Sequence, residues 1–338
     1  MRHLLPMKPS PKSPAPLAPE ARRLIENMHR AGRPPMHALG VAQARAFYDA
    51  GAPILDLPPP PIERVQALTI PSRDGHPMAA RLYAGQYANP HAGRIDQPLP
   101  VLLYLHGGGF TVGSLTTHDV LCRQLSLYGQ CAVVALDYRL APEHRFPTAV
   151  HDAWDALIWL AQNASALGLD GARLAVGGDS AGGTLAAVCA LMARDAGMPL
   201  RLQLLFYPGT TAHQDTQSHR LYERGYLLER ETVDWFFEQY IDRQDRDDWR
   251  FAPLNASEHA GVAPAWLGLA ECDPLVDEGL AYADTLRLAG VAVDLDIYRG
   301  VVHGFVTMGR AIALARQAHA DAGRALVSAW SGVAGPAG

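Results

Sequence analysis

The chain has 338 residues, of which 49% are hydrophobic and 19% charged, and its formal net charge is −5. This length supports a substantial buried core, and the weakly acidic balance argues against nucleic acid as a partner. No apolar run reaches the ~18 residues that a membrane-spanning helix needs. Residues 1–19 are too rich in proline for regular structure and lack an apolar signal core, so we expect a cytoplasmic protein.

The cysteines and histidines give no sign of a disulfide framework or a metal site. The four cysteines, Cys122, Cys131, Cys189 and Cys272, contain no Cys-x-x-Cys pair. Cys131 and Cys189 fall in apolar stretches and are predicted to be small core residues, which fits a reduced cytosolic setting. The histidines lack spacings such as His-Glu-x-x-His, so no metal is expected.

The first 60 residues are predicted to be an appendage to the main body. The apolar pattern indicates two helices, over residues 20–31 and 36–50, the second ending at Gly51. Four consecutive prolines at 58–61 form a stiff spacer. The body is therefore expected to occupy residues 61–338.

The body alternates between short apolar runs and helical stretches. It opens with a predicted hairpin of residues 65–71 and 78–84. Further strands are predicted at 101–105, 132–136, 174–176, 202–207, 265–270 and 293–298. One helix is predicted at 117–128, closed by Gly129, and the last one at 310–330. Between them, one helix is predicted to begin at Pro147, one to follow Ser180, and one to end at Gly290. This alternation predicts an α/β fold with a mostly parallel sheet covered on both faces.

The stretch 209–253 departs from that alternation. It is polar at first and then carries Trp235, Phe236, Phe237 and Tyr240. We interpret it as a helical insert. Its aromatic side chains are expected either to limit the size of a substrate or to pack the core of the insert itself.

The strongest motif surrounds Ser180. A buried strand precedes Gly178-Asp179-Ser180-Ala181-Gly182, and a run of good helix formers follows it. A serine in Gly-x-Ser-x-Gly between a strand and a helix is typical of the strained turn that carries the nucleophile of α/β-hydrolases. Only residues with little or no side chain fit at Gly178 and Gly182 in such a turn. The glycines match neither a P-loop nor the Gly-x-Gly-x-x-Gly motif.

Two further residues complete a catalytic order. Asp273 follows one predicted strand and His303 follows the last one. The order Ser180, Asp273, His303 is that of nucleophile, acid and base in α/β-hydrolases. The serine hydroxyl needs a neighbouring imidazole to accept its proton, and the imidazole needs a carboxylate to fix its tautomer.

The acid has several candidates in the sequence, because other carboxylates lie close to Asp273 and His303 along the chain. They are Glu271, Asp277, Glu278, Asp294 and Asp296. Asp273 is preferred because it stands past the strand end, where Pro274 can open the next helix and Asp273 can cap it. Asp277 would then lie one turn into that helix and point away.

Consecutive glycines follow the strand at 101–105. Gly107, Gly108 and Gly109 let the backbone approach a ligand and direct N–H groups at it. Together with the N–H of Ala181 they are predicted to form an oxyanion hole. Gly108 and Gly109 are the favoured donors, with Gly107 left open.

Several motifs in register resemble the hormone-sensitive-lipase family of bacterial carboxylesterases, from about residue 20 to the C-terminus. They are His106-Gly107-Gly108-Gly109-Phe110, Asp137-Tyr138-Arg139-Leu140-Ala141-Pro142-Glu143, Gly178-Asp179-Ser180-Ala181-Gly182-Gly183, Asp273-Pro274-Leu275-Val276-Asp277-Glu278 and His303-Gly304-Phe305. The resemblance implies an eight-stranded α/β-hydrolase fold under a helical cap, built from the N-terminal helices and the 209–253 insert. It also implies esterase activity on short acyl chains without a cofactor.

The resemblance further assigns a structural role to residues 137–143 and directs attention to the acyl pocket. Phe110 stands where many family members have tryptophan. We expect Phe110 and Tyr207 to contact substrate.

Other functions remain open at this point. An amidase or a lactonase would use the same triad, because acyl-enzyme chemistry is shared. A non-catalytic small-molecule receptor is disfavoured by the presence of His303. The sequence leaves a homodimer open.

Overall fold

A computed structural model describes residues 13–85 and 98–332, so most of the stretch 1–19 lies outside the described residues. Its centre is one sheet. The strands are β1 (Arg64–Pro71), β2 (Pro77–Ala84), β3 (Leu99–Leu105), β4 (Ala132–Leu136), β5 (Leu169–Asp179), β6 (Gln203–Phe206), β7 (Ala265–Cys272) and β8 (Val293–Val302). Their spatial order is β1-β2-β4-β3-β5-β6-β7-β8. β2 runs antiparallel to both of its neighbours, β1 and β4, and all the other neighbouring strands pair in parallel, which confirms the predicted, mostly parallel sheet.

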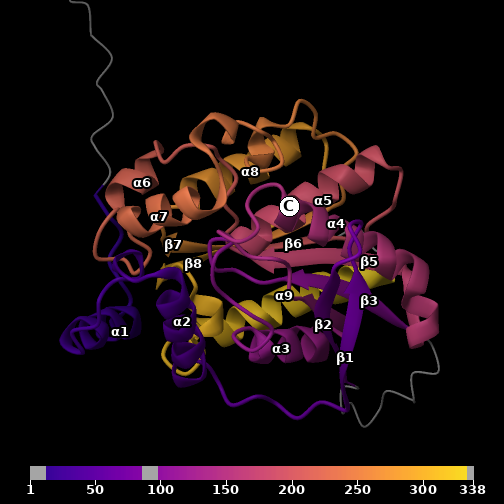
Figure 1. Ribbon diagram of the computed structural model, residues 1–338, viewed down its shortest axis with the longest axis horizontal. Coiled ribbons are helices and arrows are strands. Elements are labelled where there is room, and N and C mark those ends of the chain that lie inside the picture. The colour runs from indigo at the N-terminus through magenta and orange to yellow at the C-terminus, as the bar shows by residue number, and fades with distance from the viewer. Residues whose placement is uncertain (1–12, 86–97, 333–338) are drawn as a thin grey trace, which may run out of the picture.

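Helices cover both faces of this sheet. The α-helices of the described residues are α1 (Pro19–Arg30), α2 (Val41–Leu55), α3 (Asp119–Gly129), α4 (Thr148–Asn163), α5 (Ala181–Asp195), α6 (Gln217–Leu221), α7 (Arg230–Tyr240), α8 (Val276–Leu288) and α9 (Leu314–Ser331). In Figure 1, α3 and α9 lie below the sheet, whereas α4, α5 and α8 lie above it. The inner strands are therefore buried on both sides, which explains why they appear in the sequence as unbroken apolar runs.

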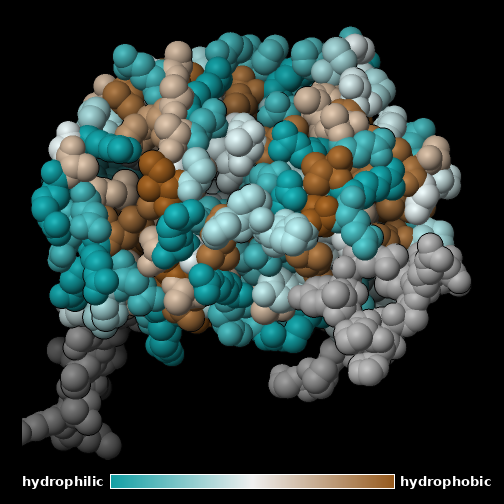
Figure 2. Space-filling model, turned by 90° about the horizontal axis from the view of Figure 1, so that it is seen from below, coloured by the Kyte–Doolittle hydropathy of each residue, from teal (hydrophilic) through white to brown (hydrophobic). Residues whose placement is uncertain are grey.

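The surface of the body is of mixed polarity. On the face seen from below, hydrophobic side chains form separate patches among hydrophilic ones (Figure 2). The edge strand β8 alternates between more and less exposed positions, and Asp294 and Asp296 are exposed on it. Within the two described ranges, no helix is long and apolar enough to cross a membrane.

The N-terminal helices differ in detail from the prediction. A short 3₁₀ turn at Met36–Ala38 precedes α2, which then continues past Gly51 to Leu55. The prediction that a single helix ends at Gly51 is wrong, because a glycine inside a helix costs only about 1 kcal/mol and does not by itself stop it. Just before α1, the N–H of Ala18 donates to the carbonyl of Gly300 in β8.

Two other helix boundaries were also predicted wrongly. Gly129 is the last residue of α3, and Gln130 instead takes the left-handed conformation with φ of 48°. Close packing explains a glycine at position 129, because a Cβ atom there would lie 2.7 Å from a methyl carbon of Leu326 in α9. α9 begins at Leu314 because the preceding residues form a turn, in which the N–H of Ile312 donates to the carbonyl of Met308.

The insert at 209–253 is helical, as the sequence predicts, and contains α6 and α7. Figure 1 places α6 and α7 with α1 and α2 beside the carboxyl ends of the parallel strands. A side-chain contact joins the two groups of helices, since Nδ1 of His37 lies 3.0 Å from Oγ1 of Thr232. Segments distant in sequence thus meet over the same edge of the sheet.

The turn between β5 and α5 is the tightest packing point of the fold. Ser180 has φ of 53°, a conformation that residues with a side chain rarely adopt. A Cβ atom on Gly182 would overlap the carbonyl oxygen of Leu105, and one on Gly178 would overlap the backbone of Gly182. These two glycines therefore allow α5 to start directly against β3.

This packing leads to a stability prediction. Gly182→Ala should lower the free energy of unfolding by about 3 kcal/mol, because backbone atoms that cannot move aside occupy the new methyl position. Gly51→Ala is the matched control. Gly51 lies inside α2 with no atom near its Cβ position, so alanine should stabilise by up to about 1 kcal/mol. Urea denaturation measures both values, and an unchanged midpoint for Gly182→Ala would contradict the packing argument.

Candidate active site

Ser180 stands at the end of β5, immediately before α5. Its N–H donates to the carbonyl of Phe206 at 2.9 Å, which fixes the strained turn from the neighbouring strand. Its Oγ lies 2.8 Å from Nε2 of His303. The serine hydroxyl is therefore within hydrogen-bond distance of an imidazole nitrogen that can accept its proton.

His303 follows β8, and its other ring nitrogen faces a carboxylate. Nδ1 lies 2.7 Å from Oδ2 of Asp273, a side chain that is fully buried behind the histidine. Oδ1 of Asp273 accepts the N–H of Leu275 at 2.8 Å. One oxygen thus holds the carboxylate in its loop while the other faces the imidazole. The ends of three parallel strands, β5, β7 and β8, bring the three residues together.

The predicted cap role of Asp273 is wrong in detail. The first helical residue of α8 is Val276, and Leu275 occupies the cap position. Asp273 lies two residues before that cap, and its carboxylate binds the loop N–H of Leu275. Pro274 therefore lies in the loop and does not open the helix.

The competing carboxylates have other partners. Asp277 accepts the N–H of Ser218 at 2.8 Å, and Glu271 accepts the N–H of Gly300 at 2.8 Å. Asp296 accepts the indole N–H of Trp266 at 3.0 Å. Each of these three carboxylates thus has a partner away from His303, and Asp294 is exposed on β8.

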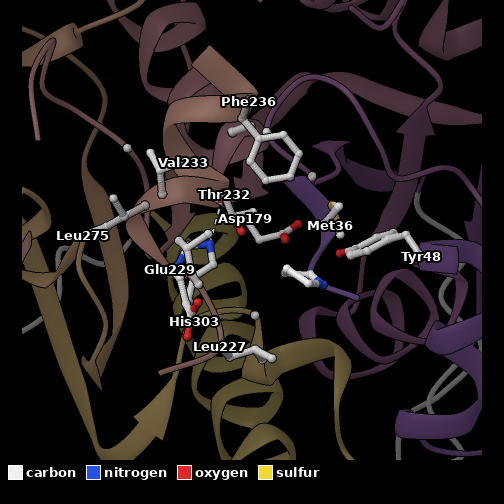
Figure 3. A pocket seen from close by; sticks show the side chains of 18 of the residues that line it. Met36, Tyr48, Asp179, Leu227, Glu229, Thr232, Val233, Phe236, Leu275 and His303 are labelled. Atoms are coloured by element: carbon white, nitrogen blue, oxygen red, sulfur yellow. Dashed lines mark hydrogen bonds between the residues drawn. The ribbon is translucent and has the colours of Figure 1, made fainter. Parts of the chain in front are cut away.

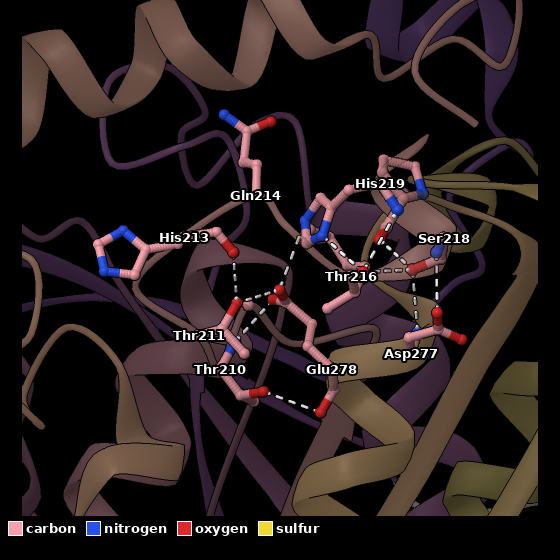
Figure 4. Close-up of polar contacts among 12 residues, drawn as sticks. Thr210, Thr211, His213, Gln214, Thr216, Ser218, His219, Asp277 and Glu278 are labelled. Carbon is pink, nitrogen blue, oxygen red and sulfur yellow. Dashed lines mark hydrogen bonds and ion pairs between the residues drawn. The ribbon is translucent and has the colours of Figure 1, made fainter. Parts of the chain in front are cut away.

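Glu278 lies in a separate polar cluster at the wall of the cavity (Figure 4). Its carboxylate accepts the N–H of Thr210 at 2.8 Å and the hydroxyl of Thr211 at 2.6 Å, and it lies 3.5 Å from Nε2 of His219. Burial raises the pKa of Glu278 to about 8 and lowers the pKa of His219. Both shifts favour the uncharged forms near neutral pH, so this cluster joins α8 to the insert without a strong local charge.

The glycine loop after β3 supplies free backbone donors, although not all those predicted. The N–H groups of Gly108, Gly109 and Ala181 are not hydrogen-bonded to any described residue, and all three residues line the cavity. The N–H of Gly107 instead donates to Oδ1 of Asp179 at 3.0 Å. Gly107 is therefore not available as an oxyanion donor, because its only N–H already has a buried partner.

Asp179 was not predicted as a functional residue, although it sits between Gly178 and Ser180 in the motif. It is buried and also accepts the hydroxyl of Tyr104 at 2.8 Å, with Nε2 of His118 at 3.3 Å. Burial by itself would raise the pKa of Asp179, but His118 and the Tyr104 hydroxyl outweigh it and lower that pKa. A charged carboxylate thus anchors Gly107, the first glycine of the loop.

A cavity of about 490 Å³ opens beside Ser180 and His303. Figure 3 shows Met36 and Tyr48 from the N-terminal part on one side, and Val233 and Phe236 of α7 on another. Most of the lining is apolar. Its aromatic members from the body and the insert are Phe110, Phe236, Phe237 and Phe251.

The two predicted substrate-contacting residues have different positions. Phe110 lines the cavity, and its ring stacks on that of Tyr240 with centroids 3.9 Å apart. Tyr207 is fully buried and does not line the cavity. Its ring lies behind His303, with centroids 4.6 Å apart, so the prediction that Tyr207 contacts substrate is wrong. The strand end that carries Tyr207 turns its side chain into the core.

Comparisons with known proteins agree with this geometry. Residues 102–307 match the family model described as the alpha/beta hydrolase fold. An ethyl acetate hydrolase of Pseudomonas putida is 44% identical over 86% of this chain and 91% of its own length. Carboxylesterase NlhH of Mycobacterium tuberculosis is 42% identical over 65% of this chain and 70% of its own length.

Solved structures show the same similarity. An ester-hydrolase from the metagenome of Lake Arreo, complexed with a derivative of bipyridine phosphonate, superposes with a TM-score of 0.87 at 37% identity, over 93% of this chain and 99% of that chain. A thermostable esterase from Pseudomonas putida gives a TM-score of 0.86 at 34% identity, over 94% and 98% of the two chains. The similarity extends well beyond the motifs.

Proposed function

Because the chain belongs to the α/β-hydrolase fold family, and within it to the hormone-sensitive-lipase group of carboxylic ester hydrolases, we propose that Ser180, His303 and Asp273 are its catalytic triad. One observation carries the assignment. A continuous path runs from Oγ of Ser180 to Nε2 of His303 at 2.8 Å, and from Nδ1 to Asp273 at 2.7 Å. This is the geometry of a nucleophile, its base and the carboxylate that orients the base.

The proposed first half-reaction forms an acyl-enzyme. His303 accepts the Ser180 proton as Oγ attacks the ester carbonyl carbon, and the carbonyl electron pair moves onto oxygen. The free N–H groups of Gly108, Gly109 and Ala181 bind that oxyanion. His303 then gives its proton to the leaving alcohol as the carbon–oxygen bond breaks.

The second half-reaction repeats these steps with water. His303 removes a proton from the water, whose oxygen attacks the acyl carbon, and then returns the proton to Oγ of Ser180 as the acid leaves. Asp273 stays ionised and stabilises the imidazolium in both halves. The two half-reactions together consume one ester and one water and release one alcohol and one acid.

We propose that the N-terminal helices α1 and α2 and the 209–253 insert form a cap that sets the substrate size. α1, α2 and α7 all contribute to the cavity wall, which supports this division. The aromatic side chains of α7 serve two purposes, since Phe236 and Phe237 line the cavity whereas Tyr240 packs beneath it on Phe110. A short or medium acyl chain fits a cavity of this size.

We favour ester hydrolysis over amide or lactone hydrolysis because of the activities named for the relatives. One relative is called an ethyl acetate hydrolase and several others carboxylesterases or esterases. We therefore propose small esters as the substrate. A cytoplasmic location and a homodimer stay predictions from the sequence.

The first prediction concerns the nucleophile. Ser180→Ala should keep the fold and lower kcat on p-nitrophenyl acetate by a factor on the order of 10⁴ or more. Mass spectrometry after treatment with a fluorophosphonate should place the adduct on Ser180 of the unmodified protein. An adduct on any other serine rejects the assignment.

The second prediction distinguishes Asp273 from Asp277 as the acid of the triad. Asp273→Asn keeps the shape but loses the correct imidazole tautomer, so kcat should fall by roughly 10³- to 10⁴-fold. Asp277→Asn is the control, because its carboxylate binds the insert at Ser218. It should change thermal stability more than turnover. If Asp277→Asn loses most of its kcat while Asp273→Asn keeps a kcat close to that of the unmodified protein, the acid is misassigned.

The third prediction concerns chain length. Esters with acyl chains of about two to eight carbons should have the highest kcat/KM, because longer chains must displace the cap. A p-nitrophenyl ester series measures this directly. Equal kcat/KM for a sixteen-carbon ester would contradict a size limit set by the cap.

A further inference from the structure

The glycine loop at residues 106–113, called the oxyanion loop below, is held by contacts from several other segments of the chain. Gly108, Gly109 and Phe110 all have positive φ angles, and glycine backbones resist displacement weakly. Inside the loop, the N–H groups of Thr111 and Val112 donate to the carbonyl of Gly108, and the hydroxyl of Thr111 donates to the carbonyl of Gly109. Nδ1 of His106 also lies 2.8 Å from the carbonyl oxygen of Gly107. Neighbouring segments add the contacts that fix the loop relative to the rest of the site.

One end of the loop is held from within the body. The N–H of Gly107 donates to buried Asp179, as described above. This contact fixes the residue before the two free donors. This hydrogen bond does not hold the part of the loop that follows Gly109.

The other end is held by Arg45, which belongs to α2 in the N-terminal part. Its Nε donates to the carbonyl of Thr111 at 2.9 Å, and its Nη2 donates to the carbonyl of Ala141 at 2.8 Å. Both terminal nitrogens also contact the carboxylate of Glu143, at 2.9 and 2.6 Å. One guanidinium thus joins the loop, the 141–143 segment and α2.

Further contacts make this junction specific. The N–H of Ala141 donates to the carbonyl of Phe110 at 2.8 Å, so the segment that Arg45 binds is itself bonded to the loop. Ala44, next to Arg45, is fully buried and packs with Val112 and Phe236. The hydrogen bond to Arg45 lowers the pKa of Glu143, which favours the charged partner. A planar fork matches a carboxylate in this way, whereas a lysine cannot.

We propose that Arg45 is a positioning residue for the oxyanion hole, so that α2 contributes to catalysis without touching the reacting atoms. The inference rests on the proposed function, because it needs Gly108 and Gly109 to bind the oxyanion. Backbone donors stabilise a transition state only when they point at the place where charge develops. Removing Arg45 releases the carbonyl of Thr111 and lets both donors drift.

The proposal also gives Glu143 a purpose. Residues 137–143 were expected to be structural only, and Glu143 has no contact with the triad. Its carboxylate orients the guanidinium, whose remaining bonds go to the carbonyls of Thr111 and Ala141. Glu143 thus acts on the loop only through Arg45. Its loss should therefore have a smaller effect on kcat than the loss of Arg45.

The test compares Arg45→Gln with the unmodified protein and uses kcat per active site. Titration to completion with a phosphonate counts the competent sites, which removes any loss due to misfolding. Arg45→Gln should lower kcat by about 10- to 100-fold with KM changed less than about twofold, because removing one oxyanion donor outright costs about 10²- to 10³-fold. Glu143→Gln should lower kcat by less than Arg45→Gln, and Arg45→Lys should fall between Arg45→Gln and the unmodified protein.

Arg23→Gln is the matched control, because Arg23 is an exposed arginine of α1. It should leave kcat and KM unchanged. A kcat per titrated site within twofold of normal for Arg45→Gln overturns the proposal, as does a loss confined to KM or to the fraction of active sites. Failure of the proposed function gives a different result, since Ser180→Ala would then remain active whatever the Arg45 variants show.

Discussion

The close approach of β3 to the start of α5 is the constraint on which the site depends. Gly178 and Gly182 carry no side chain, so the carbonyl of Leu105 sits where a methyl group would otherwise be. This contact brings the loop after β3 and the first N–H groups of α5 to the same place. Ser180 therefore lies beside free N–H groups from two segments, and the serine and the proposed oxyanion donors are positioned together.

The buried carboxylate of Asp179 helps to hold this arrangement in place. Asp179 is enclosed by Tyr104, His118 and the N–H of Gly107, which together compensate for the loss of water around the carboxylate. An unpaired carboxylate in this position would be strongly destabilising, so the partners must stay in place. The same hydrogen bonds that satisfy Asp179 also fix the first glycine of the loop. Burial and catalytic geometry thus depend on the same contacts.

The N-terminal helices and the insert have more than a covering role in this structure. His37 contacts Thr232 of α7, Ala44 packs with Phe236, and Arg45 reaches the loop and Glu143. These contacts form a small second core between the two cap segments and the oxyanion loop. Helix α2 thus links the insert to the oxyanion loop, because it contacts both.

Much of the site could be predicted from local sequence. Gly178-x-Ser180-x-Gly182 specifies a turn by sterics alone, and the carboxyl ends of parallel strands converge whatever their side chains are. The order of Ser180, Asp273 and His303 therefore identified three residues that the structure brings within hydrogen-bond distance. The eight-stranded sheet and the helical insert follow from apolar periodicity in the same way.

Only the tertiary structure decided which polar groups are free. The sequence left Gly107 open as a third donor beside Gly108 and Gly109, but its N–H is bonded to a carboxylate 72 residues away. Tyr207 ends a predicted strand, but the direction of its side chain into the core depends on the packing of His303 against it. Arg45 and Glu143 lie 98 residues apart and carry no pairing signal in either segment. Local sequence sets backbone conformation, whereas the partner of a donor or a ring depends on what the folded chain brings next to it.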